Sequence, residues 1–123
     1  MTTRKRCRAG SNKWLRTLYN ELNLEFFGDK LPKDLKFEWA KIPSTHIARV
    51  LWNRQPDGTY KPMRFQVHEL MKPRIFQKKV GMTMLHEMVH IKRGPSIVCE
   101  DWDGPFDQEM FDLAKRGAFR LFW

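Results

Sequence analysis

The chain has 123 residues and a mass of 14.8 kDa, enough for one domain with its own core. Hydrophobic residues make up 41% of it and aromatic residues 13%, which excludes a disordered chain. No apolar run approaches the roughly 20 residues of a membrane-spanning helix, and no apolar segment follows the basic start as in a secretory signal. Cys7 and Cys99 are too few for a disulfide framework. We expect a cytoplasmic monomer with no membrane partner.

Positive charge dominates: 23 Lys and Arg oppose 14 Asp and Glu, a formal net charge of +9. Residues 1–20 hold six basic side chains and no acidic one, so we expect a basic arm over 1–12 and one domain over 13–123. Basic clusters attract phosphate backbones, although a solvated surface is the alternative. The residues predicted to contact DNA are Arg4, Lys5, Arg6, Arg8, Lys13, Lys72, Arg74, Lys78 and Lys79. Aromatic side chains that could stack on unpaired bases are Trp52, Tyr60 and Trp102, with core packing as the alternative.

A helix is predicted directly after Ser11, which can cap it. Its apolar residues recur at the three-and-four spacing of one face: Trp14, Leu15, Leu18, Tyr19, Leu22, Phe26 and Phe27. Gly28 is expected to end it in a left-handed conformation.

Three strands should follow. Alternation predicts a strand over Leu35–Trp39 and another over Ile47–Trp52, and Met63, Phe65 and Val67 alternate in a third. Asp57-Gly58 marks the turn of a hairpin between the second and third strands. Pro62 argues against regular pairing where the third strand begins.

Two more helices complete an α+β domain. The first is expected over Pro73–Arg93, with Gly81 as its weak point and Gly94-Pro95 as its end. Pro105 can begin the last helix, which should turn Phe106, Met110, Leu113 and Ala114 toward the core.

The pattern His-Glu-x-x-His over 86–90 lies in the apolar part of the first of these two helices. Residues four apart on a helix differ by about 40° around its axis, so His86 and His90 can bind one zinc ion. Glu87 is then placed to take a proton from the attacking water without being a ligand. A helix that carries two histidines by chance is the alternative.

Two histidines do not complete a catalytic zinc site, which normally has three protein ligands. His46 and His68 lie upstream of the pentad, and the candidates downstream are Cys99, Glu100, Asp101, Asp103 and Asp107. Crowded carboxylates favour a divalent cation, although an acidic loop would look the same.

Several short sequence blocks, taken in chain order, resemble the SprT-like metalloprotease domain. This family includes the Spartan DNA–protein crosslink proteases. The blocks, spread over Trp14 to Leu113, are Leu18–Asn23 with Phe26-Phe27, Leu31-Pro32, Phe37–Pro43, Leu85–His90 and Asp103–Phe106. The resemblance implies a minimal zincin-like α+β domain with one zinc ion on His86 and His90 and with Glu87 as general base. It also implies an endopeptidase that acts on DNA-associated or DNA-crosslinked proteins.

The family's third ligand is usually a histidine in an H-G-x-x-F block. Asp103 stands at that position here, in a block one residue shorter, so Asp103 is the predicted third ligand, ahead of Asp101 and Glu100. Aligning the block on Phe106 instead would select Trp102, which cannot bind zinc. Two histidines and one carboxylate suit zinc, and also Fe²⁺ or Mn²⁺.

Two other functions fit the same sequence. The aspartate at the third position would suit a nucleic-acid-binding module whose metal site is structural or vestigial. A small protein-interaction or inhibitor scaffold is the other alternative.

Overall fold

The computed structural model describes residues 11–95 and 104–122, without the side chain of Leu121. The first helix, α2 (Asn12–Phe26), begins as predicted, because the Ser11 side chain accepts a hydrogen bond from the Trp14 backbone N–H at 3.0 Å. Gly28 follows it with φ +61°, the left-handed conformation expected. The buried Asn23 side chain then exchanges two 3.1 Å hydrogen bonds with the backbone of Leu31, which fixes the chain leaving the helix.

The sheet has three strands: β1 (Lys36–Ala40), β2 (Ala48–Arg54) and β3 (Tyr60–His68). The predicted hairpin of β2 and β3 is confirmed, and its register shifts after Leu51, where Trp52 pairs with Pro62. The strand order is β1-β3-β2, with β1 parallel to β3. In this order β2 is an edge strand of the sheet formed by the described residues.

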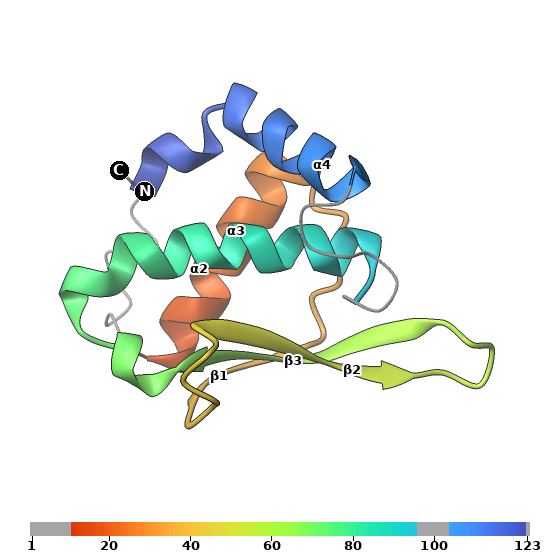
Figure 1. The fold of residues 1–123 in the computed structure, drawn as a ribbon, viewed down its shortest axis with the longest axis horizontal. Helices are drawn as coiled ribbons and strands as arrows, with labels where there is room; N and C mark the ends of the chain where they lie inside the picture. The colour runs from red at the N-terminus through yellow and green to blue at the C-terminus, as the bar shows by residue number, and fades with distance from the viewer. Residues whose placement is uncertain (1–10, 96–103, 123) are drawn as a thin grey trace.

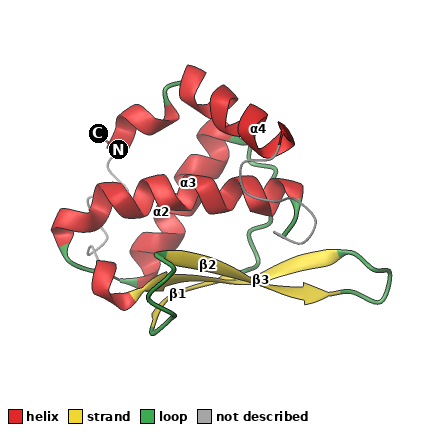
Figure 2. Cartoon of the chain, viewed as in Figure 1, coloured by secondary structure: helices red, strands yellow, loops and turns green. Residues whose placement is uncertain are grey.

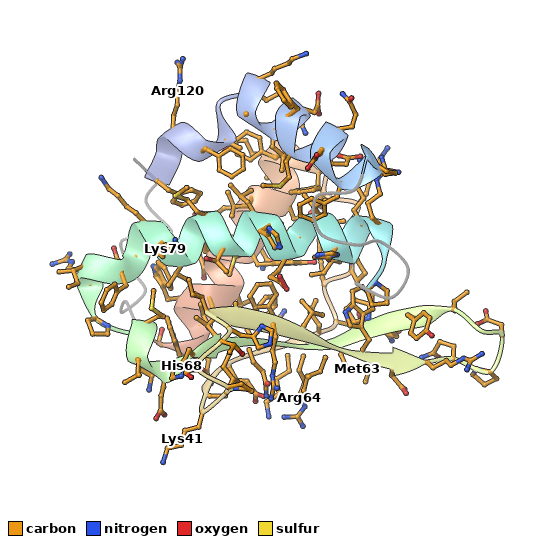
Figure 3. All side chains as sticks on the ribbon, in the orientation of Figure 1. Lys41, Met63, Arg64, His68, Lys79 and Arg120 are labelled. Carbon is orange, nitrogen blue, oxygen red and sulfur yellow. The ribbon has the colours of Figure 1, made fainter. Side chains whose placement is uncertain are left out.

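The sheet's two faces differ. The long helices that are described lie on one side of it, and none of them covers the other, which we call the open side (Figures 1 and 2). On the open side Gln66 links Arg49 to Glu38, and Arg64 pairs with Glu38 (Arg64 is labelled in Figure 3). On the covered side Phe37, Phe65 and Val67 join the core.

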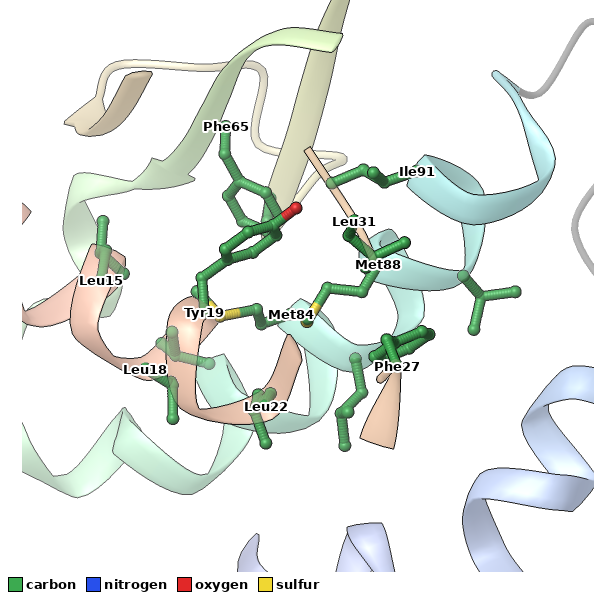
Figure 4. Close-up of a cluster of buried hydrophobic side chains, with 14 of the residues drawn as sticks. Leu15, Leu18, Tyr19, Leu22, Phe27, Leu31, Phe65, Met84, Met88 and Ile91 are labelled. Carbon is green, nitrogen blue, oxygen red and sulfur yellow. The ribbon is translucent and has the colours of Figure 1, made fainter. Parts of the chain in front are cut away.

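The second helix, α3 (Gln77–Arg93), begins later than predicted. Pro73 caps a short 3-10 turn, η2 (Arg74–Phe76), and another, η1 (Glu69–Met71), precedes it. The predicted end is confirmed, since Gly94 stands after Arg93 with φ +117°. Met84 and Met88 project from α3 against Tyr19, Phe65 and the leucines of α2 in the core (Figure 4).

The last helix, α4 (Gly104–Lys115), buries Phe106 and Leu113 and half-buries Met110. The prediction for Ala114 was wrong: it is exposed, because α4 turns a narrower stripe inward than the spacing suggested. A final 3-10 helix, η3 (Ala118–Phe122), was not predicted.

The contact of η3 with α3 explains Gly81. A Cβ atom on Gly81 would overlap Cε1 of the buried Phe122 ring, so only glycine admits this approach. The glycine that the sequence marks as the weak point of this helix is therefore required by packing. The order of helices and strands confirms the α+β class. No helix within 11–95 or 104–122 is long and apolar enough to cross a bilayer.

Candidate metal centre

The two histidines of the pentad lie side by side on α3. Their ring centroids are 5.5 Å apart at an interplanar angle of 67°. His90 is buried, and the His86 side chain is 23% exposed. Both line the same pocket as Glu87, so the structure gathers these three predicted site residues.

The backbone at the end of α3 orients the His90 ring. Its Nδ1 lies 3.2 Å from the carbonyl oxygen of Gly94, which can only accept a hydrogen bond. Nδ1 therefore carries the proton in this contact, and the lone pair of the neutral ring is on Nε2. A carbonyl that fixes the tautomer in this way is the usual outer partner of a metal-binding histidine.

Glu87 lies beside the other imidazole. Its Oε2 is 3.9 Å from Nε2 of His86, and its side chain is 15% exposed. The carboxylate is thus at the pocket rather than in the apolar core.

The pocket has a volume of about 580 Å³ and lies between α3, β2 and the C-terminal segment. One face of α3 lines it at helical spacing: Lys79, Met82, Thr83, His86, Glu87 and His90. The opposite wall includes His46, Ala48, Val50 and Trp52, and Met110 and Phe119 also contribute.

Phe106 packs directly against the histidines. The sequence predicted only that this side chain would be buried in the core. Its ring centroid lies 4.8 Å from that of His86 and 4.9 Å from that of His90. The signal that could have pointed to it is its place in the Asp103–Phe106 block.

An ion cluster fastens α4 to α3 beside this contact. Oε1 of the buried Glu109 accepts hydrogen bonds from Lys92 Nζ and Arg93 Nη2, both at 2.7 Å. Burial by itself raises the pKa of Glu109, but the hydrogen bonds and charges of the two cations outweigh it and hold that pKa below its ordinary value.

The predicted third ligand and its alternatives lie in a segment next to α4. Asp103, Asp101, Glu100 and Cys99 lie outside them, and Asp103 directly precedes Gly104, where α4 begins. No three His, Cys, Asp or Glu side chains within 11–95 and 104–122 are grouped closely enough to hold a metal ion.

The upstream histidines differ from each other. His46 lines the pocket, on the turn before β2. His68 instead caps η1, where its Nδ1 accepts a hydrogen bond from the Leu70 backbone N–H at 3.2 Å. The structure therefore gives His68 a local structural role.

The residues predicted to bind DNA fall into two groups. Arg4, Lys5, Arg6 and Arg8 lie outside the described residues, as does Trp102, whereas Lys13, Lys72, Arg74, Lys78 and Lys79 are exposed. The last four lie around η2 and the start of α3. Lys79, which is labelled in Figure 3, also lines the pocket. Cations in the first turn of a helix oppose its dipole, so Lys78 and Lys79 do not stabilise α3 through the helix dipole.

The two aromatic candidates that are described, Trp52 and Tyr60, are half-buried. Trp52 lines the pocket, so it is placed to contact whatever the pocket binds.

No protein-family model matches this chain, and neither does any curated protein or solved structure. The SprT-like resemblance therefore stays a prediction from the order of the sequence blocks.

Proposed function

We propose that this chain is a zinc-dependent endopeptidase of the SprT-like, zincin-like type that acts on DNA-associated or DNA-crosslinked proteins. The observation that carries the proposal is the arrangement on α3: two imidazoles 5.5 Å apart and a carboxylate between them in sequence, all lining one pocket. A pocket in which a few polar groups converge is the default candidate for a binding or active site.

The ligands would be His86 and His90, with Asp103 as the third and Asp101 or Glu100 as the alternatives. The donor set fits, because an Nδ1–H donated to the Gly94 carbonyl puts the lone pair of a neutral His90 ring on Nε2. Two imidazoles with one carboxylate suit catalytic zinc. The chemistry that a bound zinc supplies is Lewis acidity, which polarises the scissile carbonyl and lowers the pKa of a coordinated water.

Glu87 would be the general base. Its carboxylate lies on the same side as Nε2 of His86, so it can take a proton from the attacking water. It would then pass that proton to the leaving amine as the peptide bond breaks.

The substrate would be an extended polypeptide. β2 is an edge strand of the described sheet and also forms a wall of the pocket. Its outer backbone groups can pair with an added strand, which gives affinity with little dependence on sequence.

DNA would approach along the cations of η2 and α3. Lys72, Arg74 and Lys78 are exposed, and Lys79 reaches from this group into the pocket wall. Phosphate contacts at these positions would bring a protein attached to DNA beside the pocket.

The experiment is cleavage of an unfolded protein, free or crosslinked to single-stranded DNA, before and after chelation. Activity should disappear with the metal and return with Zn²⁺, and His86→Ala should lose both zinc and activity. A well-folded protein that retains stoichiometric zinc yet cleaves neither substrate would overturn the proposal and favour the nucleic-acid-binding module.

A charge-reversal pair tests the DNA part separately. Lys72→Glu with Arg74→Glu should weaken single-stranded DNA binding and lower the salt slope of log K by about 2. Lys30→Glu with Lys33→Glu makes the same charge change on the loop after α2 and should leave that slope nearly unchanged. Equal losses in both pairs would show that only net charge matters.

A further inference from the structure

Phe106 completes a triangle of rings with the two histidines. It is fully buried, and its centroid is 4.8 Å from His86 and 4.9 Å from His90, while the imidazoles are 5.5 Å apart. The ring planes meet Phe106 at 59° and 41°, so each imidazole packs obliquely on the same phenyl group. One apolar side chain thus touches both proposed ligands.

An imidazole needs this kind of restraint before it can bind a metal in a defined geometry. Its χ2 torsion has a broad, roughly two-fold preference, so an unrestrained ring turns easily and exchanges the positions of its two nitrogens. The Gly94 carbonyl restrains His90. His86 is the more exposed ring, and the Phe106 contact limits the angles it can adopt.

The position of Phe106 is itself fixed from two sides. Glu109 lies three residues later on the same face of α4 and binds Lys92 and Arg93, which follow His90 almost directly. Leu113, one further turn along, is fully buried in the core. The ion cluster and the apolar stripe therefore hold α4 against α3 at the level of the histidines.

We propose that Phe106 is a positioning residue that holds His86 and His90 in the ring orientations a metal ion needs, an inference that rests on the proposed metal centre. It would act by preorganisation, since ligands held in place before binding lose less conformational freedom when the metal arrives. Its removal should therefore weaken metal binding before it changes anything else at the pocket.

The test compares Phe106→Ala and Phe106→Leu with Phe111→Ala, a matched control on the same helix whose side chain is 66% exposed. Zinc affinity is measured by chelator competition, and Co²⁺ is added as a spectroscopic probe of ligand geometry. We expect Phe106→Ala to bind zinc about 10- to 100-fold more weakly, the range seen when outer partners of metal ligands are lost. Phe106→Leu should be intermediate with an altered Co²⁺ band, and Phe111→Ala should match the parent.

Circular dichroism of the metal-free proteins separates positioning from folding. Phe106→Leu keeps most of the buried volume, so it decides the question even where Phe106→Ala does not fold. Parental zinc affinity and a parental Co²⁺ spectrum in folded Phe106→Leu would overturn the inference while leaving the proposed function intact. A parent protein that binds no zinc would overturn both.

Discussion

Glu87 and Glu109 lie on neighbouring helices, yet their surroundings differ in kind. Oε1 of Glu109 is 2.7 Å from both Lys92 Nζ and Arg93 Nη2, and the residue is 7% exposed. Glu87 faces the pocket, with its Oε2 3.9 Å from Nε2 of His86. One carboxylate binds two cations, and the other lines the pocket.

Burial and partners, rather than residue type, separate a structural carboxylate from a candidate catalytic one. A buried carboxylate with two charge-assisted hydrogen bonds is compensated within the fold. Glu87 lines a pocket, 3.9 Å from an imidazole nitrogen, where we propose that it transfers a proton.

The largest expected effect separates the two glutamates directly. Glu87→Gln should lower kcat for peptide hydrolysis by about a thousandfold, within the range for loss of a general base, because the amide cannot take the proton. Zinc content and melting temperature should stay near those of the parent. Peptide hydrolysis at the parental rate in this variant would remove Glu87 from its proposed role.

Glu109→Gln should behave in the opposite way. It leaves Lys92 and Arg93 without their shared carboxylate, so we expect a loss of about 1 to 3 kcal/mol in the free energy of unfolding, as for hydrogen bonds to charged groups. Urea unfolding measures it. Unchanged stability would mean that solvent, which reaches about half of each cation, already satisfies them.

Acid should remove the same contribution in the parent. The pKa of Glu109 is lower in the folded chain than in the unfolded one, so its stabilisation is complete above the unfolded pKa, near 4.3, and is lost as pH falls through the folded pKa. The stability difference between the parent and Glu109→Gln should therefore shrink below about pH 4. A constant difference from pH 7 to pH 3 would contradict the lowered pKa.

The smallest effect is expected near the start of α3, away from the histidines. Gly81→Ala gains about 1 kcal/mol of helix propensity but forces the new methyl against Phe122, at a cost of about 1 to 3 kcal/mol. We expect a net destabilisation of about 1 kcal/mol in thermal or urea unfolding. Gly104→Ala is the control, since nothing lies within 4 Å of its Cβ position. Equal stability of both variants would show that Phe122 moves away freely.

The local features were predictable from the sequence. The cap at Ser11, the end of α3 at Gly94 and the β2–β3 hairpin each depend on residues a few positions apart. The same holds for the shared face of His86 and His90, which helical geometry determines on its own.

Only the tertiary structure decided which of these surfaces meet. The parallel pairing of β1 with β3, the Phe122 contact at Gly81 and the Phe106 contact with both imidazoles join residues far apart in the chain. The tertiary structure also distinguishes His46, which lines the pocket, from His68, which caps a turn. Periodicity shows which face of an element is apolar, whereas the partner of that face depends on how all the faces pack together.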